Sequence, residues 1–402
     1  MFKILTSALT LALLLPICAS AQNTWSPKDS VNGAPRSVSS SFILNNEAYI
    51  VAGLDEEGFR RKMYSYDFLQ DDWDQEESLG GINSAGLNRG SACAFAVGFK
   101  AYVCLGQGET NGFFKDNWEY DLVSQTWSQK SDFIGEARRQ AVAFVIDAIA
   151  YIGTGIAPSG LKKDMYSYDV TTNTWTQLND FGGTARKEAA AFTMGGEGYI
   201  GTGDDGVMRN DFWQYAPSTD TWVQKASLPG LPRKGAVGWG IFPNAYICTG
   251  EDNTFNYSTD LWEYNFWLDS WTQQPNIPGP GRSNAVAFVL NGLGFVGTGY
   301  NGIFLDDLYA FTPTLSNGIE LEKGDVNIYP LPASDRVTID VNNQDLELVL
   351  LGLDGKQLST DKYVVKTDTG FMIRRNDLST GTYFFQLVGS TGAVYSDKIL
   401  FN

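Results

Sequence analysis

Tryptophan recurs through this chain at a nearly fixed interval of 47 to 54 residues. The positions are Trp25, Trp73, Trp127, Trp175, Trp222 and Trp271. A period in this range, in a chain rich in short strand-like segments, is typical of a solenoid or a propeller. Because the repeats supply a common scaffold, we expect function to depend on the positions at which they differ.

Each repeat contains four strand-like segments. A Gly-x-x-Arg motif precedes an apolar first strand such as 141–146, and a tight turn such as Asn291-Gly292 follows. The second strand ends in small residues, as in 151–155, and the third alternates aromatic side chains, as in 166–169. The fourth strand carries the tryptophan. A single sheet of this kind cannot bury both faces, so radial packing of several sheets is expected.

The two ends of the repeat region complete each other. The last repeat, from Gly279 to Phe311, lacks a tryptophan strand, whereas residues 23–28 form a tryptophan strand with no repeat before it. The sequence therefore predicts an all-β fold. It predicts a six-bladed β-propeller over residues 22–315, closed by the N-terminal strand.

The repeat resembles that of the kelch β-propellers. The resemblance depends on the first-strand arginine, the Tyr-x-x-x-Gly strand, the aromatic-x-Tyr-Asp strand and the final tryptophan, and it covers about residues 23–315. The usual Gly-Gly pair is replaced here by Gly-Thr-Gly, as at 153–155, or by Ala52-Gly53. The resemblance implies a kelch-like propeller.

The repeat ends after Phe311, and the following residues have a different pattern. We expect a linker at 316–324 and a small Ig-like β-sandwich at 325–402. This tail resembles the C-terminal sorting domain of type IX secretion in Gram-negative bacteria. The matching residues are Tyr329, Pro330, Pro332, Asp354, Gly355, Lys356, Leu378, Gly381 and Tyr383, with Leu331 in place of the family's Asn. The resemblance implies export by the type IX machinery to the outer cell surface or the medium. A binding sandwich is the alternative.

Residues 1–21 have the pattern of a signal peptide, with Lys3, an apolar run to Ile17 and a small-residue segment ending at Ala21. Cys18 offers a lipoprotein alternative, but Ile17 stands where such signals have a small residue. The apolar run is too short for a transmembrane helix, and no other segment is long enough.

Composition excludes several function classes. The formal net charge of −17 argues against nucleic-acid binding, because phosphate contacts require Lys and Arg. The absence of histidine excludes Ser-His-Asp catalysis and histidine-ligated metals. Cys93 and Cys104 are expected to face each other on paired strands, either as a disulfide or as two buried thiols. We expect a monomer without a cofactor.

One arginine precedes the first strand of every repeat, and we name these as candidate binding residues: Arg36, Arg89, Arg138, Arg186, Arg233 and Arg282. In a propeller they would lie in a ring near one mouth of the central channel. The guanidinium group suits carboxylates, sulfates and sugar acids. The alternative is structural, with each arginine paired to an acid or to backbone carbonyls of its own repeat.

The loops between second and third strands differ freely among the repeats, and residues 74–88 form the longest loop before a first strand. Both loop types should lie on one face, which is typical of a binding surface, although neutral variation remains the alternative. Acidic pairs such as Asp204-Asp205 and Glu251-Asp252 lack complete metal-ligand spacing, so no metal site is predicted.

These observations favour a secreted or cell-surface propeller that binds an extracellular glycan or protein, without covalent chemistry. The alternative is a sugar epimerase or mutarotase acting on an acidic sugar, similar to the kelch-type sialic-acid mutarotases, which need no histidine. A passive structural component of the matrix is a third hypothesis.

Overall fold

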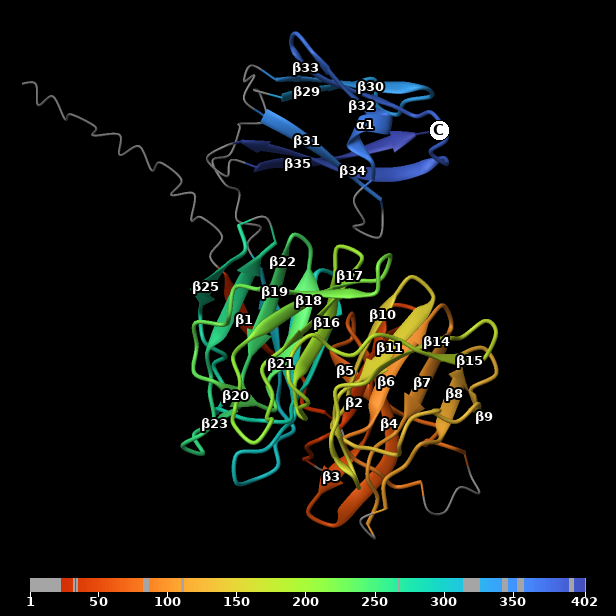
Figure 1. Cartoon of the computed structure of the whole chain (residues 1–402), viewed down its shortest axis with the longest axis vertical. Coiled ribbons are helices and arrows are strands. Elements are labelled where there is room, and N and C mark those ends of the chain that lie inside the picture. Colours follow the sequence, from red (N-terminus) through yellow and green to blue (C-terminus); the bar gives the residue numbers. More distant parts are fainter. Residues whose placement is uncertain are drawn as a thin grey trace, which may run out of the picture.

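A computed structural model describes residues 23–31, 33, 35–81, 87–109, 112–266, 268–313, 326–341, 346–352, 358–389 and 394–401. These residues are almost entirely strands and turns, with one short helix, α1 at Thr360–Tyr363 (Figure 1). The all-β prediction is confirmed. No helix in this part of the chain is long and apolar enough to cross a membrane. The predicted signal peptide (1–21) and linker (316–324) lie outside the described residues.

The strands up to residue 312 form six four-stranded antiparallel sheets among the described residues. The first sheet contains β2 (Ser40–Leu44), β3 (Glu47–Asp55), β4 (Gly58–Asp67) and β5 (Asp72–Glu76). The second contains β6 (Cys93–Val97), β7 (Lys100–Cys104), β8 (Asn117–Asp121) and β9 (Thr126–Lys130). The third contains β10 (Val142–Ile146), β11 (Ile149–Gly153), β14 (Met165–Asp169) and β15 (Thr174–Gln177).

The fourth sheet contains β16 (Ala190–Met194), β17 (Glu197–Gly201), β18 (Phe212–Ala216) and β19 (Thr221–Lys225). The fifth contains β21 (Val237–Ile241), β22 (Asn244–Cys248), β24 (Leu261–Asn265) and β25 (Ser270–Gln274). The sixth contains β26 (Val286–Leu290), β27 (Leu293–Gly297), β28 (Leu308–Thr312) and β1 (Thr24–Lys28). Short pairs in the loops are β12 (Ile156–Ala157) with β13 (Gly160–Leu161), and β20 (Arg233–Lys234) with β23 (Glu251–Asp252).

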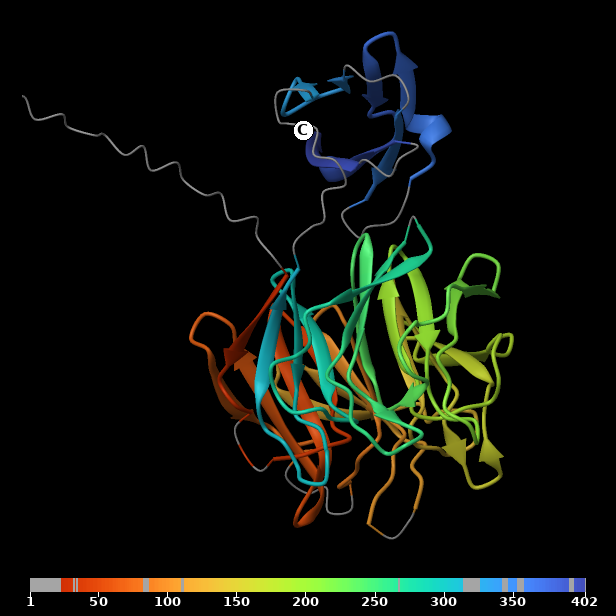
Figure 2. The same ribbon diagram turned by 90° about the vertical axis from the view of Figure 1, so that its left-hand side faces the viewer.

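The sixth sheet joins the start of the repeat region to its end. β1 runs alongside β28 (Figure 2) and pairs with it in antiparallel fashion. In this register Trp25 lies opposite Phe311. The Trp25 ring also packs edge-on against Trp239 of the fifth sheet. The orphan tryptophan strand thus supplies the fourth strand that the last repeat lacks.

Sequence-predicted turns have the expected backbone. Asn45 and Asn46 both have positive φ, as do Asn291 and Gly292. Positive φ at both central residues defines the type I′ turn, whose twist matches that of a hairpin. The turn at Gly98-Phe99 likewise places Cys93 directly opposite Cys104, and both cysteines are buried and unbonded.

An inner ring of backbone hydrogen bonds joins all six sheets. In each sheet, the residue two positions before the first strand donates its N–H to the carbonyl of the equivalent residue in the neighbouring sheet, over 2.8 to 3.1 Å. The sixth of these hydrogen bonds closes the circle. We call these residues the inner ring: Val38, Ser91, Gln140, Glu188, Gly235 and Asn284. All have φ between 49° and 60°, a conformation that few non-glycine residues adopt. The backbone of the ring is therefore common to all sheets, and only its side chains differ.

A second circle of hydrogen bonds involves one glycine at the end of the small-residue segment of each repeat: Gly53, Gly106, Gly155, Gly203, Gly250 and Gly299. In each sheet its N–H donates to the carbonyl of the repeated arginine of the next sheet, over 2.7 to 2.9 Å. Gly155 illustrates why glycine is required: its φ is 89°, and an added Cβ would lie 2.7 Å from the Arg139 carbonyl oxygen. Close packing of this glycine against the segment before its own first strand thus depends on the missing side chain.

The periodic tryptophans connect neighbouring sheets at their outer edge. The indole N–H of Trp175 donates to the Ser131 carbonyl at 2.9 Å, and that of Trp127 to the Glu77 carbonyl at 2.9 Å. Trp73 and Trp271 make the same kind of bond to residues 44 and 45 positions away, and Trp25 makes it to the Pro275 carbonyl, 250 positions away. The tryptophan period therefore marks an inter-sheet hydrogen bond at five of its six positions; the buried indole N–H of Trp222 has no hydrogen-bond partner among the described residues.

The second group of strands follows residue 325. One sheet contains β29 (Val326–Tyr329), β30 (Arg336–Val341), β33 (Gly370–Arg374) and β32 (Val364–Thr367), and the other contains β31 (Leu346–Leu351), β34 (Gly381–Gly389) and β35 (Val394–Phe401). Buried residues of both sheets form one hydrophobic core. Leu378 and Tyr383 of the predicted motif lie in it. Asp354, Gly355 and Lys356 lie outside the described residues.

Candidate binding site at the channel mouth

The six repeated arginines are all buried, with 0 or 1% of each residue exposed. Five make a two-pronged ion pair with an aspartate of the same sheet: Arg89–Asp116, Arg138–Asp164, Arg186–Asp211, Arg233–Asp260 and Arg282–Asp307. This geometry agrees with the structural alternative for these five. A binding role for the six arginines stays a prediction.

Arg186 shows how completely such a guanidinium is used. Its Nη1 and Nη2 donate to the two carboxylate oxygens of Asp211 at 2.5 and 2.7 Å. Nη1 also donates to the Thr202 carbonyl at 2.8 Å, and Nε donates to the Thr184 carbonyl at 3.1 Å. The arginine therefore links the loop before the first strand to the second and third strands.

Asp164 and Asp211 stay ionised although they are partly buried. Burial alone would raise the pKa of the Asp211 carboxyl, but hydrogen bonds and charge from Arg186 outweigh it and hold that pKa below its ordinary value. Arg138 lowers the pKa of Asp164 against burial in the same way. These pairs fix the loops around the channel rather than leave a charge facing it.

The channel itself is enclosed by the first strands of the six sheets, which contact one another in a closed circle. Its mouth is a pocket of about 170 Å³ lined by the inner ring and by the residue after each ring position. The residues that follow the inner-ring positions are small and similar to one another, as in Ser39, Ala92, Ala141 and Ala236. The inner ring itself varies from glycine to glutamate. The repeated arginines do not line this pocket.

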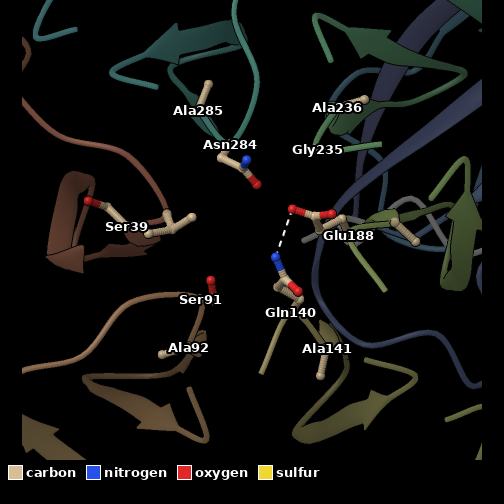
Figure 3. Close-up of a pocket in the computed structure, with 12 residues that line it drawn as sticks. Ser39, Ser91, Ala92, Gln140, Ala141, Glu188, Gly235, Ala236, Asn284 and Ala285 are labelled. Atoms are coloured by element: carbon tan, nitrogen blue, oxygen red, sulfur yellow. Dashed lines mark hydrogen bonds between the residues drawn. The ribbon is translucent and has the colours of Figure 1, made fainter. Parts of the chain in front are cut away.

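Gln140, Glu188 and Asn284 point toward the centre of the mouth (Figure 3). Gln140 Nε2 donates to Glu188 Oε1 at 2.7 Å. Glu188 Oε2 and Gln140 Oε1 are buried and accept no hydrogen bond from the described residues. Lys187 Nζ lies 4.0 Å from Glu188 Oε2, beyond hydrogen-bond distance. Two adjacent acceptors are thus left for a group that donates hydrogen bonds.

Glu188 is an unusual carboxyl for a central channel because its side chain is only 7% exposed. Burial raises the pKa of the Glu188 carboxyl above its ordinary value, and Asp204 and Glu251 add to the increase. Lys234 and Lys187 oppose it without cancelling it. A buried acid of raised pKa in a concave site is a candidate functional group.

Charged residues precede the inner ring on the third, fourth and fifth sheets, at Arg139, Lys187 and Lys234. Lys187 Nζ is 3.6 Å from Asp204, and Lys234 Nζ is 3.7 Å from Glu251. On the first and second sheets the corresponding positions are Ser37 and Gly90. The side chains around the mouth are therefore charged on one side and small on the other. The described residues contain no group of three or more Cys, Asp or Glu side chains that could hold a metal ion.

The chemistry of the mouth differs from the anion site that the arginines suggested. Its unsatisfied groups are acceptors, and an acidic side chain lies among them, so it suits hydroxyl, amide or ammonium donors. Glu188 was not among the candidate residues predicted from the sequence, because differences among the repeats were sought only in the loops. The signal was present two residues after each arginine, where the six repeats carry Val, Ser, Gln, Glu, Gly and Asn.

Replacement of Glu188 by glutamine should stabilise the protein at neutral pH. A carboxyl whose pKa is raised by folding stabilises fully below the unfolded pKa, and this contribution is lost as the pH rises through the folded value. We therefore expect Glu188→Gln to raise the melting temperature at pH 7 and to change it little at pH 4. Glu197 is a second acid whose pKa is raised by burial, and it lies outside the mouth pocket. Glu197→Gln therefore tests whether the rise in melting temperature follows from burial of any carboxyl. An unchanged pH 7 melting temperature for Glu188→Gln would contradict the assignment.

Models of two known families match the chain, one in the repeat region and one in the tail. Residues 40–237 match the model described as the KLHDC2/KLHL20/DRC7 Kelch-repeats domain. Residues 327–402 match the model described as the secretion system C-terminal sorting domain. No curated protein matches the chain.

Proposed function

We propose that this chain, which carries kelch repeats and a type IX sorting domain and is secreted or held at the outer cell surface, binds a glycan at its channel mouth. We take the six sheets as the blades of one propeller over residues 22–315, and the tail at 325–402 as an Ig-like sorting domain.

The observation that carries this proposal is the pair of buried acceptors, Glu188 Oε2 and Gln140 Oε1, at a position where the backbone is common to all sheets. A buried acceptor without a partner costs about 1–3 kcal/mol, so a ligand that satisfies it recovers that free energy. Sugar hydroxyls donate hydrogen bonds at closely spaced positions and suit two neighbouring acceptors.

The size of the mouth indicates how much of a glycan enters it. Its volume of about 170 Å³ is below the roughly 300–1,000 Å³ of typical small-molecule pockets. We therefore expect one sugar unit to reach the inner ring while further units lie across the loop face. Exposed apolar side chains on the loops of the fourth, fifth and sixth sheets, Val207, Phe255 and Ile303, offer contact for these units.

A glycan array probed with the full chain tests the proposal. We expect saturable binding to a limited set of glycans. Binding should be lost in Gln140→Ala, which removes one acceptor and the hydrogen bond to Glu188. Gln129→Ala, on the exposed outer strand β9, serves as the matched control and should bind as the wild type does. No saturable ligand would favour the hypothesis of a passive matrix component.

A second candidate function, a kelch-type mutarotase acting on an acidic sugar, is favoured by one observation. Glu188 is an acid of raised pKa, as a general acid or base needs to be near neutral pH. Anomerisation of a sialic acid, followed by NMR, distinguishes the two functions. Acceleration by the wild type and its loss in Glu188→Gln would establish the enzyme. Equal rates with and without protein would leave binding alone.

A further inference from the structure

We propose that the channel mouth selects glycans that carry an acetamido group, as N-acetylated amino sugars do; the proposal rests on the glycan binding proposed above. Two features of the pocket support it. Hydrogen-bonding side chains lie on opposite sides of the inner ring, and small side chains line the pocket beside them. An acetamido group has a matching composition, with one donor, one acceptor and a small apolar end.

One side of the mouth offers hydrogen-bond acceptors. Gln140 and Glu188 are neighbours in the inner ring. Because Gln140 Nε2 donates to Glu188 Oε1 at 2.7 Å, the amide oxygen of Gln140 is left out of that contact. This oxygen and Glu188 Oε2 are buried and have no hydrogen-bond partner among the described residues. A ligand N–H can therefore donate to either of them.

The opposite side of the mouth carries Asn284. Asn284 is three positions from Gln140 around the six-membered inner ring, so the two side chains face each other across the mouth (Figure 3). Gly235, which lies between Glu188 and Asn284 in the ring, has no side chain to fill the space beside them. A ligand group that enters the mouth is therefore placed between the two acceptors and the amide of Asn284.

The amide of Asn284 can donate a hydrogen bond to a ligand carbonyl. Its Nδ2 donates to Ser283 Oγ over 3.4 Å, which is long for a hydrogen bond. A serine hydroxyl can accept a hydrogen bond or donate one, so Ser283 can equally donate to the amide oxygen. The amide N–H groups of Asn284 then face the mouth, opposite the acceptors of Gln140 and Glu188.

A secondary amide suits groups that are arranged in this way. Its N–H and C=O lie in one plane and point in opposite directions, because the amide bond is trans. The N–H of an acetamido group would donate to Gln140 Oε1 or Glu188 Oε2, while the carbonyl oxygen accepts from Asn284. A hydroxyl carries its donor and its acceptors on one oxygen, whereas an amide separates them across its C–N bond.

Small apolar side chains leave room for the methyl group. Five residues that follow inner-ring positions and line the pocket are alanines: Ala92, Ala141, Ala189, Ala236 and Ala285. A second cavity of about 180 Å³ shares three of them and extends to Ala94 and Ala143 in the first strands. A methyl group at the end of a ligand fits walls of this kind. A peptide chain, with a side chain on each side of every amide, does not enter such a mouth end-on.

Ligand-observed NMR titrations of the full chain test the proposal. The probes are N-acetyl-D-glucosamine, N-acetyl-D-galactosamine and N-acetyl-D-mannosamine, each compared with its parent sugar, D-glucose, D-galactose or D-mannose. We expect at least one acetamido sugar to bind saturably, and roughly tenfold or more tightly than its parent, the factor that one net hydrogen bond supplies. Asn284→Asp keeps the shape of the side chain but removes its N–H donors, so it should abolish this preference while thermal unfolding stays cooperative.

Asn301→Asp is the matched control, because it makes the same exchange and the same change of charge in the same sheet. Asn301 lies in the loop between β27 and β28 and does not line the mouth. Its side-chain oxygen accepts the backbone N–H of Ile303 at 3.5 Å, and an aspartate oxygen can do the same. The control should keep the preference for the acetamido sugar. Equal loss in both variants, or a preference retained by Asn284→Asp, would overturn the proposal.

Other results would overturn the proposal in ways that separate it from glycan binding itself. Parent sugars that bind as tightly as the acetamido sugars would leave glycan binding intact without this selectivity. No binding of any of these sugars would also overturn it, while the glycan array decides glycan binding separately. Tighter binding of the free amino sugars would mean that Glu188 selects a cation. Equal binding of N-acetylglycinamide would assign the mouth to secondary amides of peptides as well.

Discussion

Loss of the fourth strand of the sixth sheet should destabilise the whole repeat region. A chain that begins at Asp29 instead of Gln22 lacks β1, and with it the ladder to β28 and the Trp25 ring between Trp239 and Phe311. It also lacks the indole bond to the Pro275 carbonyl at 2.8 Å. Burial of one large aromatic side chain contributes roughly 1.5–3 kcal/mol, and each hydrogen bond about 1 kcal/mol. We expect a loss of at least ~3 kcal/mol.

Thermal unfolding of the shortened chain measures this loss. A destabilisation of this size should lower the melting temperature by at least about 6 °C. Trp25→Ala in the complete chain separates the ring from the strand and should show an intermediate effect. Lys28→Ala, at the half-buried end of β1, is the control and should change little. An unchanged melting temperature for the shortened chain would mean that β1 does not close the propeller.

Removal of one paired aspartate should be similarly damaging. Asp211→Ala leaves the guanidinium of Arg186 buried without its carboxylate, and breaking a buried ion pair from one side costs about 3–5 kcal/mol. The Trp213 indole also loses its acceptor, which lies at 2.8 Å. Lys62→Ala, at the equivalent position of the first sheet, should cost less than ~0.5 kcal/mol because that side chain is exposed.

The pH dependence gives a second test of the ion pair. Since folding lowers the pKa of Asp211, the stability from this carboxylate is present above its unfolded pKa and is lost as the pH falls through the folded value. The difference between wild type and Asp211→Ala, measured by urea unfolding, should be constant near neutral pH and should shrink only below pH 3.8. A difference that is already small at pH 7 would contradict a structural role for these pairs.

The repeat made much of the fold predictable. Periodic tryptophans, hairpin turns such as Asn291-Gly292 and the orphan strand at 23–28 indicated the strands and their pairing, because each follows from local chemistry. The strands of the first sheet were harder to predict. From the sequence, residues 54–62 are expected to form a loop between the second and third strands. In the structure β3 extends to Asp55 and β4 begins at Gly58, because Arg60 binds Asp55 and Glu57 across the hairpin.

The candidate site was less predictable than the fold. The repeated arginines were conspicuous in the sequence, yet burial and ion pairing of five of them depend on contacts with the third strand that the sequence does not show. Glu188 was inconspicuous in the sequence, because only the closed circle of backbone hydrogen bonds places it at the channel mouth. A site formed by one residue from each repeat requires knowledge of how the repeats meet.

The most direct test of the account is the affinity of the best glycan from the array for a symmetrised variant. Gln140→Ser with Glu188→Ser gives both inner-ring positions the residue that the second sheet carries at Ser91, without disturbing the common backbone. Loss of hydrogen bonds worth about 2.7 kcal/mol in all corresponds to roughly 100-fold weaker binding. We expect this loss of affinity, measured by calorimetry, with the melting temperature maintained. A folded symmetrised variant that binds the glycan as tightly as the wild type would contradict it.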